Sequence, residues 1–365
     1  MKVLIFRTCS VPININSYNV QEIGLAKSLV NNGNECGIIF YTNAKKSSIE
    51  SLEYNGKVIK IYWMKGINFL HHGLYNLKSI LNIVEDYDIV QCSDYNQIMT
   101  YKMLKYSTKP VVIYHGPYKN NFNWKTNILE WTFDLIFLKK MLNIQPTIIC
   151  KSKLAENTLK EKGFKNLTTI PVGLDISRFL EKKDDKISLK RSTLLYVGQI
   201  SKRRSIDFLL DLEKYLHNQK IDCELLLIGN GNQKYLKHIL KRIEEENLQS
   251  DVKWIKKMSQ DELCKYYNSS SVFLLPSNYE IFGMVLLEAN YFNLPIISTL
   301  NGGSISIIND DKDGYIIEDL SLNEWANKVE LLLSRKKTQR KFEHTWNDRL
   351  EKFLKIYKLE IGKNK

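Results

Sequence analysis

Residues 276–290 have the sequence PSNYEIFGMVLLEAN, in which Glu280 and Glu288 stand eight positions apart. The apolar run at 272–275 predicts a buried strand, and residues 276–278 predict a turn. The spacing of apolar residues over 284–292 predicts a helix that ends before Pro295. Glu280 is therefore expected in a loop and Glu288 on the helix that follows it.

The spacing of the two glutamates allows two interpretations. A helix that begins near Phe282 would present unpaired N–H groups and a partial positive charge to an anion. Positions eight apart differ by about 80° around a helix axis, so both carboxylates could face one ligand. Alternatively, Glu280 is a helix-start residue favoured by the helix dipole, and Glu288 is solvated. The spacing alone does not decide between them.

Short motifs with glycine or proline turns lie on both sides of this stretch. In chain order they are PVGLD at 171–175, YVGQ at 196–199, LLLIGNG at 225–231, LPIIST at 294–299, NGG at 301–303 and DGY at 313–315. Their glycines permit positive φ angles and let a backbone approach a phosphate closely. Together with the two glutamates, this ordered series resembles the retaining glycosyltransferases of family 4, strongly over about residues 150–320.

The resemblance implies a role for each glutamate. In that family the first glutamate contacts the donor sugar, the N–H groups after it hold the diphosphate, and the second glutamate binds the nucleotide ribose. The resemblance therefore assigns the sugar contact to Glu280, as a catalytic residue, and the ribose contact to Glu288. The diphosphate contacts fall on the segment after Glu280, which comprises Ile281 in place of the usual glycine, Phe282, Gly283 and Met284.

A departing diphosphate needs positive charge beside it, and cationic side chains can supply this without a metal. The resemblance assigns further donor contacts to Gly198, Gln199, Arg203, Arg204, Gly229 and Gly231. Gln199 stands where the family usually has arginine, and Arg204 stands where it has lysine, followed by Ser205 instead of glycine. Arg203 or Arg204 could supply the missing charge, since guanidinium groups suit phosphate oxygens. A solvated basic turn is the alternative.

His115 follows the apolar run at 111–114, which places it at an expected strand end facing a cleft. Lone histidines are usually structural. The family has a histidine near the donor sugar at this place, so the resemblance implies sugar contact or active-site positioning for His115. The pair His71 and His72 has no partner spacing that indicates a metal site. No metal and no cofactor is expected, the substrate being a nucleotide sugar of UDP or GDP type.

Apolar runs and helical stretches alternate along both halves of the chain. This rhythm predicts parallel sheets with helices on both faces, and 365 residues exceed what one core usually supports. We expect two doubly wound, Rossmann-like α/β domains, an acceptor domain at 1–172 and a nucleotide-sugar domain at 173–340. A final helix within 341–365 should cross back to the first domain. This is the GT-B architecture that the resemblance implies, with a cleft between the two sheets.

The net charge of +13 has three explanations: nucleic acid, an anionic membrane surface, or a coding bias towards Lys, Asn and Ile. No nucleic-acid motif is recognisable, so a nucleic-acid partner is not expected. Residues 131–142 could lie on an anionic membrane as an amphipathic helix. A core helix explains their apolar positions equally well, and it is the interpretation that we favour.

The six cysteines are widely scattered, which indicates free thiols in a reducing compartment. The N-terminus has no secretory pattern, and no run approaches the roughly 18 apolar residues of a membrane span. The expected location is the cytoplasm, with the inner face of the membrane as a second site of action.

The sequence therefore predicts a retaining glycosyltransferase that moves a sugar from a nucleoside-diphosphate sugar to a glycan or lipid-linked glycan, in surface polysaccharide synthesis. One alternative is a non-catalytic sugar-nucleotide-binding protein with a degenerate site. Departures from the family pattern at Gln199, at Asn16 in the first loop, and at Ser306 suggest it. A sugar-nucleotide epimerase is the other enzyme considered.

Overall fold

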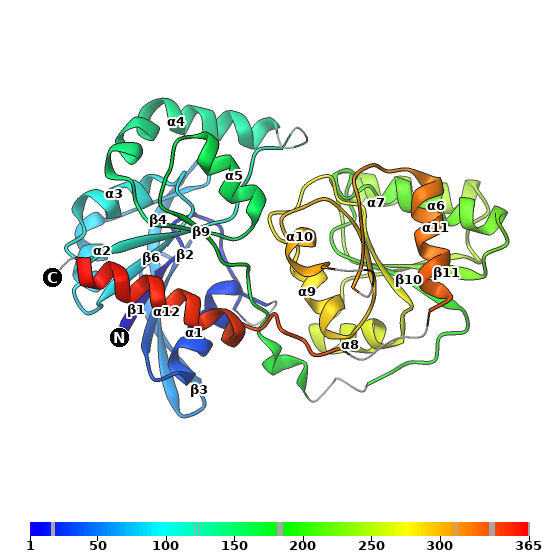
Figure 1. Ribbon diagram of the computed structural model, residues 1–365, viewed down its shortest axis with the longest axis horizontal. Coiled ribbons are helices and arrows are strands. Elements are labelled where there is room, and N and C mark those ends of the chain that lie inside the picture. Colours follow the sequence, from blue (N-terminus) through cyan, green and yellow to red (C-terminus); the bar gives the residue numbers. More distant parts are fainter. Residues whose placement is uncertain are drawn as a thin grey trace. The chain divides into compact units, whose positions relative to one another are not determined.

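The computed structural model describes residues 1–15, 19–120, 122, 124–180, 185–309, 311, 313–335 and 340–363. The chain forms two compact α/β units (Figure 1). Unit 1 comprises Met1–Asp175 together with His344–Lys365, and unit 2 comprises Ile176–Glu343. Both unit boundaries lie three residues further along the chain than the domain boundaries expected from the sequence.

Unit 1 is built on a nine-stranded sheet in the order β3-β4-β2-β1-β6-β7-β8-β9, with β5 paired to β4. The strands are β1 (Lys2–Phe6), β2 (Glu35–Thr42), β3 (Ser48–Tyr54), β4 (Lys57–Phe69), β5 (His72–Tyr75), β6 (Ile89–Ser93), β7 (Val111–His115), β8 (Ile148–Cys150) and β9 (Leu167–Thr169). Parallel pairing from β4 to β9 aligns Phe6 with Cys92, Ser93 with Tyr114 and His115 with Cys150. The carboxyl ends of the central strands therefore meet at one edge.

Two antiparallel strands depart from the expected all-parallel sheet. β3 and β5 both pair antiparallel with β4. The β3–β4 turn is Asn55-Gly56, with φ of 51° and 71°, and an Asn-Gly pair at positive φ is a strong hairpin signal. The β4–β5 turn uses Leu70 and His71 at φ of 48° and 69°, where no glycine marks it in the sequence.

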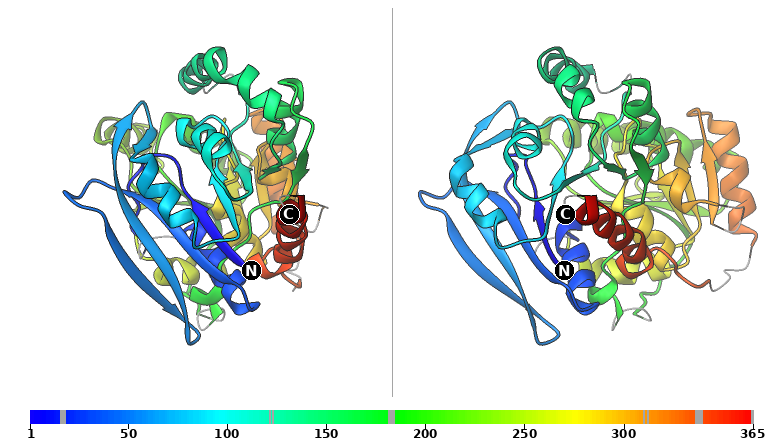
Figure 2. Two further views of the ribbon diagram at one scale, coloured as in Figure 1. Left: turned by 90° about the vertical axis from the view of Figure 1, so that its left-hand side faces the viewer. Right: turned by 60° about the vertical axis from the view of Figure 1, so that its left-hand side comes forward.

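The helices of unit 1 are α1 (Gln21–Asn31), α2 (Leu77–Val84), α3 (Ile98–Tyr106), α4 (Trp124–Ile144), α5 (Lys153–Glu161) and α12 (Trp346–Lys363). α12 packs beside α1, as Figures 1 and 2 both show. Its inward residues are Trp346, Leu350, Phe353 and Tyr357. The Tyr357 hydroxyl donates to Gln91 Oε1 on β6 at 2.6 Å, so the end of the chain completes the core of unit 1.

α4 is only partly a core helix, so the favoured interpretation of residues 131–142 is wrong for one face. Phe133 and Met141 are buried, whereas Trp131, Leu135 and Ile136 are 59–67% exposed. Apolar side chains occupy both faces of this helix. Periodicity alone therefore could not tell which face the rest of the protein covers.

Unit 2 contains six parallel strands in the order β12-β11-β10-β13-β14-β15. They are β10 (Ser192–Val197), β11 (Cys223–Ile228), β12 (Val252–Ile255), β13 (Val272–Leu275), β14 (Ile296–Thr299) and β15 (Gly314–Ile317). Numbered along the chain, the order is 3-2-1-4-5-6, the arrangement of dinucleotide-binding α/β folds. Ligands bind such sheets where the strand order reverses, which here is between the carboxyl ends of β10 and β13.

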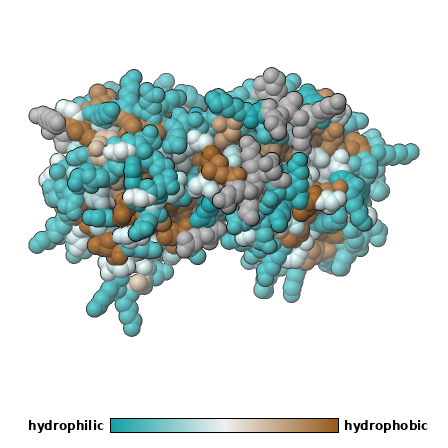
Figure 3. All heavy atoms as spheres, turned by 90° about the horizontal axis from the view of Figure 1, so that it is seen from below, coloured by the Kyte–Doolittle hydropathy of each residue, from teal (hydrophilic) through white to brown (hydrophobic). Residues whose placement is uncertain are grey.

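The helices of unit 2 are α6 (Ile206–Asn218), α7 (Gln233–Glu245), α8 (Gln260–Ser269), α9 (Met284–Tyr291), α10 (Ser304–Ile307) and α11 (Leu322–Leu333). Polar caps begin several of them. Ser259 and Glu262 form a capping box at α8, and the Ser321 side chain accepts from Glu324 N–H at α11. On the face drawn in Figure 3, apolar residues form small separate groups among hydrophilic ones.

Among the described residues, no helix combines the length and apolar character needed to cross a membrane. All six cysteines are free, and five of them are buried.

One carboxyl group lies buried at the amino-terminal edge of the unit 2 sheet. Glu213 of α6 is 2% exposed, and the Cys223 thiol donates a weak hydrogen bond to its carboxyl group at 3.9 Å. Burial, together with the negative charges of Asp251 and Glu224, raises the pKa of Glu213 to about 8, although Arg191 opposes the shift. The native state therefore keeps a proton on Glu213 that the unfolded chain has lost at neutral pH.

This raised pKa predicts a pH-dependent stability. From about pH 5 to 8 the native state binds more protons at Glu213 than the unfolded state does, so the free energy of unfolding should fall as pH rises. The contribution of one group is at most about 1.4 kcal/mol per pH unit. Urea unfolding of wild type and Glu213→Gln at pH 5.5, 6.5 and 7.5 should show a flatter pH dependence in the variant. Glu330→Gln, at an exposed helix position, is the control, and equal slopes in all three proteins would contradict the prediction.

Candidate functional site

Loops from three neighbouring strands meet at the reversal point of the unit 2 sheet. The 3-10 turn Lys202–Arg204 follows β10, and Asn278 N–H, in the loop after β13, donates to the carbonyl oxygen of Arg203 at 3.1 Å. After β14, Gly302 N–H donates to the carbonyl oxygen of Glu280 at 3.3 Å. Backbone hydrogen bonds therefore hold the three loops together around Glu280.

The carboxylate of Glu280 lies between two arginines. It is 7% exposed, and its Oε1 atom contacts Arg204 and accepts from Arg203 Nη1 at 3.2 Å and from Ser277 Oγ at 3.1 Å. Arg203 Nη1 also donates to the carbonyl oxygen of Tyr279. The alternative of a solvated basic turn is therefore wrong for Arg204, whose side chain is 15% exposed, whereas the Arg203 side chain is 40% exposed and meets solvent as well as Glu280. Two guanidinium groups share one carboxylate, so the cluster keeps a net positive charge.

α9 begins directly beside this cluster. It starts at Met284, as the apolar spacing over 284–292 predicts, and Gly283 precedes it at φ 75° with no side chain to accept from the first N–H groups. Phe282 is 2% exposed, whereas Ile281 is 38% exposed. A Cβ on Gly303 would overlap the carbonyl oxygen of Phe282, so the loop after β14 can approach only because glycine stands there.

Glu288 lies on α9, as the sequence predicts, and has partners of its own. It is 1% exposed and accepts hydrogen bonds from Gln260 Nε2 at 3.1 Å and from the Tyr267 hydroxyl at 2.9 Å. Burial raises its pKa to about 7, against the effect of these two donors. A carboxylate has about four acceptor positions, so two bonds leave it capacity for hydroxyl donors. Gln260 and Tyr267, both on α8, were not predicted.

The glycine turns after β10 and β11 lie against each other. Gly198 N–H donates to the carbonyl oxygen of Ile228, and a Cβ on Gly229 would overlap the carbonyl oxygen of Gly198. Ile200 pairs with Gly231 in a β-bridge. At Gly229, close packing of one turn on the other already requires glycine, apart from any phosphate contact.

Two of the departures from the family pattern can be located. Gln199 is exposed, and its carbonyl oxygen accepts from the Tyr196 hydroxyl at 2.8 Å. Ser306 lies on α10, where its hydroxyl donates to the carbonyl oxygen of Gly302 at 3.3 Å. Asn16, the third departure, lies outside the described residues.

His115 belongs to unit 1 and ends β7, as the sequence predicts. It is 1% exposed, and its Nδ1 atom lies 3.2 Å from Asp94 Oδ1, which also accepts from Gly116 N–H at 3.0 Å. Although burial alone would raise the pKa of Asp94, the hydrogen bond from His115 and the charge of Lys151 lower it to about 2. Asp94 therefore stays ionised and fixes the orientation of the imidazole ring.

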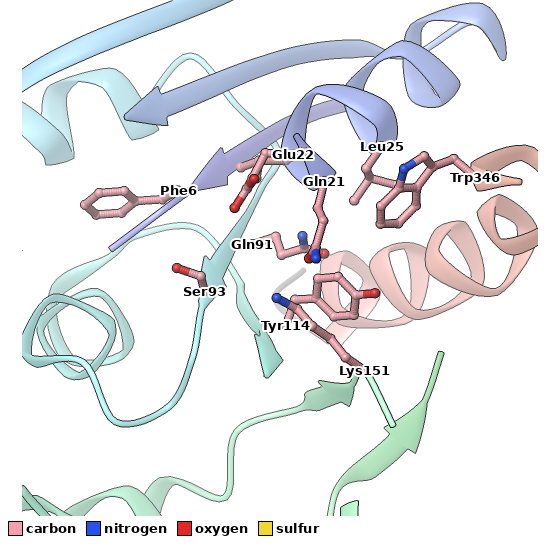
Figure 4. Close-up of a pocket in the computed structure, with 10 residues that line it drawn as sticks. Phe6, Gln21, Glu22, Leu25, Gln91, Ser93, Tyr114, Lys151 and Trp346 are labelled. Atoms are coloured by element: carbon pink, nitrogen blue, oxygen red, sulfur yellow. The ribbon is translucent and has the colours of Figure 1, made fainter. Parts of the chain in front are cut away.

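A pocket that the sequence did not reveal lies between the unit 1 sheet and helices α1 and α12 (Figure 4). Its empty space is about 310 Å³ when the open solvent at its mouth is included. Its lining is mostly polar or aromatic and includes Gln21, Glu22, Gln91, Ser93, Tyr114, Lys151 and Trp346. Ser93, Tyr114 and Lys151 lie at or directly after the ends of neighbouring strands. This shared position is the feature of the sequence from which part of the pocket could have been predicted. The helix positions, above all Trp346, are too distant in sequence to be foreseen.

Among the described residues, no three His, Cys, Asp or Glu side chains are grouped so that they could hold a metal ion.

Two family models match consecutive parts of the chain. The model described as Glycosyltransferase Family 4 matches residues 23–178, and the model described as Glycosyl transferases group 1 matches residues 177–347. This chain belongs to glycosyltransferase family 4. The two matches follow the division into units closely, because they meet at residues 177–178 and unit 2 begins at Ile176.

The curated relatives of this family 4 protein align with only part of the chain. The amylovoran biosynthesis glycosyltransferase AmsD of Erwinia amylovora is 29% identical over 164 residues, which are 45% of this chain and 44% of AmsD. The chain thus spans less than half the length of such relatives.

Solved structures establish the GT-B fold for this family 4 protein. Sucrose-phosphate synthase from Thermosynechococcus elongatus superposes with a TM-score of 0.67 at 15% identity, covering 100% of this chain and 94% of that one. HepE of Anabaena, solved in complex with UDP and glucose, superposes with a TM-score of 0.60 at 13% identity, covering 100% and 98%.

Ser205, the residue that replaces the family's glycine, has a conformation that favours glycine. It precedes α6 at φ 52° and ψ 44°, and its side chain makes no capping hydrogen bond. A residue with a Cβ costs roughly 1–2 kcal/mol in this left-handed region. Ser205→Gly should therefore be more stable than Ser205→Ala by about 1 kcal/mol in urea unfolding, although both variants lack the hydroxyl. Equal stability of the two variants would mean that the backbone at this position is not strained.

Proposed function

We propose that this protein transfers a sugar, with retention of the anomeric configuration, from a nucleoside-diphosphate sugar to a glycan or lipid-linked glycan acceptor. Membership of glycosyltransferase family 4 supports glycosyl transfer, and the resemblance in sequence supports retention. The observation that carries the proposal is the convergence of Arg203, Arg204 and Glu280 beside the start of α9, where no side chain caps the first N–H groups. The proposal includes no metal and no further cofactor.

The chemistry fits this cluster. Breaking the bond between the anomeric carbon and the diphosphate leaves the electron pair on a phosphate oxygen. The acceptor hydroxyl forms the new bond to that carbon, and its proton passes to the departing diphosphate. Two guanidinium groups and the N–H groups of α9 would stabilise the charge on the phosphates. Glu280 would then orient the arginines and contact the sugar, while positive character develops at the anomeric carbon.

The donor in this proposal is a nucleotide sugar of UDP or GDP type. The complex of HepE with UDP and glucose supports the uridine form. Glu288 would accept hydrogen bonds from the ribose hydroxyls, and His115 would contact or position the donor sugar. The name of AmsD supports polysaccharide assembly as the context, and the acceptor would bind to unit 1.

Replacing Glu280 by glutamine should lower kcat by roughly a hundredfold, the usual effect of losing one preorganised electrostatic partner. The side-chain volume is kept, so the protein should remain folded. Turnover is measured as release of the nucleoside diphosphate in the presence of acceptor, with Glu245→Gln on α7 as an exposed control. Turnover of Glu280→Gln within a few-fold of wild type would refute the role given to this residue.

Changes at Glu288 should act mainly on nucleotide binding. Glu288→Gln keeps one acceptor oxygen but not the charge, and we expect it to weaken binding of the matching diphosphate about tenfold by calorimetric titration. UDP, GDP, ADP and CMP are compared by thermal stabilisation, since a ligand at about 100 times its Kd stabilises the native state by roughly 2.7 kcal/mol. No stabilisation of the folded protein by any of them would favour a degenerate site.

A further inference from the structure

The outer face of α4 carries four large apolar side chains that the other described residues of unit 1 leave at least half exposed. Trp124, Ile128, Trp131 and Leu135 recur at intervals of four, three and four residues, so they share one side of the helix. They are 59%, 50%, 59% and 67% exposed, respectively. We call these four residues the α4 stripe. Figures 1 and 2 show α4 at the outside of unit 1.

The opposite face of α4 is firmly attached to unit 1. Lys162 forms ion pairs with Glu130, at 2.6 Å, and with Asp134. The Tyr95 hydroxyl donates to the same two carboxylates at 3.1 and 3.0 Å, and the Phe133 ring packs against Tyr95. Both acidic side chains of α4 are therefore turned inward and paired, while the stripe faces outward.

The charged residues on the exposed part of α4 are all lysines. Lys125 and Lys139 are exposed beside the stripe, and the Nζ atom of Lys125 lies 5.5 Å from the centre of the Trp124 ring. Lys140 is exposed as well, but its Nζ atom lies over the Phe137 and Tyr101 rings, away from the stripe. α4 is described throughout its length, and none of its carboxylates is exposed. The outer face thus combines indole and aliphatic groups with positive charge only.

We propose that the α4 stripe docks on a bilayer surface that contains anionic phospholipids. Helices that lie in a bilayer interface carry Trp and Leu on one side and Lys beside them, and long lysine stems let the charges reach the headgroups. Indole rings favour the interface because they are largely apolar with one polar N–H. Protein interfaces, in contrast, are depleted in lysine and favour arginine.

Charge supports a lipid partner over a second copy of this chain. The whole chain carries a net charge of +13, so two copies meeting through lysine-flanked stripes would repel each other. An anionic bilayer attracts the same face. The proposal concerns a surface in unit 1 and uses no residue of the donor site, so it stands or falls separately from the proposed transferase activity.

The test is flotation of the full chain with vesicles of phosphatidylcholine alone or with 30% phosphatidylglycerol, in 0.1 M salt. We expect binding to the anionic vesicles at least tenfold stronger than to the neutral ones, and weaker binding at 0.5 M salt because of screening. Tryptophan fluorescence should shift to shorter wavelength on binding. Equal binding to both vesicles, or no binding to either, overturns the proposal.

Matched variants locate the surface. Trp131→Ser with Leu135→Ser should lower vesicle binding at least tenfold, while Ile49→Ser with Val58→Ser, at exposed positions on β3 and β4, should leave it unchanged. Lys125→Glu with Lys139→Glu should abolish the preference for anionic vesicles. Lys234→Glu with Lys237→Glu on α7 changes the net charge by the same amount and should leave that preference unchanged.

Circular dichroism verifies that each variant is folded. Two further outcomes would also overturn the proposal. One is that the stripe variant, Trp131→Ser with Leu135→Ser, and the control variant, Ile49→Ser with Val58→Ser, lose vesicle binding equally. The other is a dimer in vesicle-free solution that Trp131→Ser with Leu135→Ser dissociates, because the stripe would then be an interface between copies of this chain.

Discussion

The contact of one carboxylate with two guanidinium groups organises the end of the unit 2 sheet. Arg203 and Arg204 are neighbours in the chain, and like charges this close repel each other unless an anion lies between them. Glu280 supplies that anion from the next strand loop. The loop after β14 joins the same point through its backbone. The loops can meet here because β10, β13 and β14 are neighbours in the sheet and because glycine at 303 lets the third loop approach the segment before α9.

Both units place charged groups at strand ends, but they do so with different partners. In unit 1, Asp94 follows β6, is hydrogen-bonded to His115 and is stabilised as an anion by the charge of Lys151. In unit 2, arginines and helix N–H groups surround Glu280. The first arrangement fixes an imidazole, and the second leaves excess positive charge. Parallel sheets bring such side chains together because their strands all end at one edge.

The sequence predicted what depends on neighbouring residues. Glu280 in a loop, Glu288 on a helix and His115 at a strand end all follow from local apolar runs and turn residues. It did not predict contacts between distant segments, such as those of Gln260 and Tyr267 with Glu288, or that of Trp346 with the unit 1 pocket. It also misjudged α4, since an apolar pattern on both faces does not say which one is covered.

The position of α12 has a consequence for how the protein is made. Unit 1 begins with the first residue but needs Trp346, Phe353 and Tyr357 to close its core. During synthesis, all of unit 2 leaves the ribosome before those residues do. Unit 2 can therefore fold while apolar residues of unit 1 are still exposed, because α12 has not yet been synthesised. A fragment ending at Asp175 would lack α12 and would leave those apolar residues exposed.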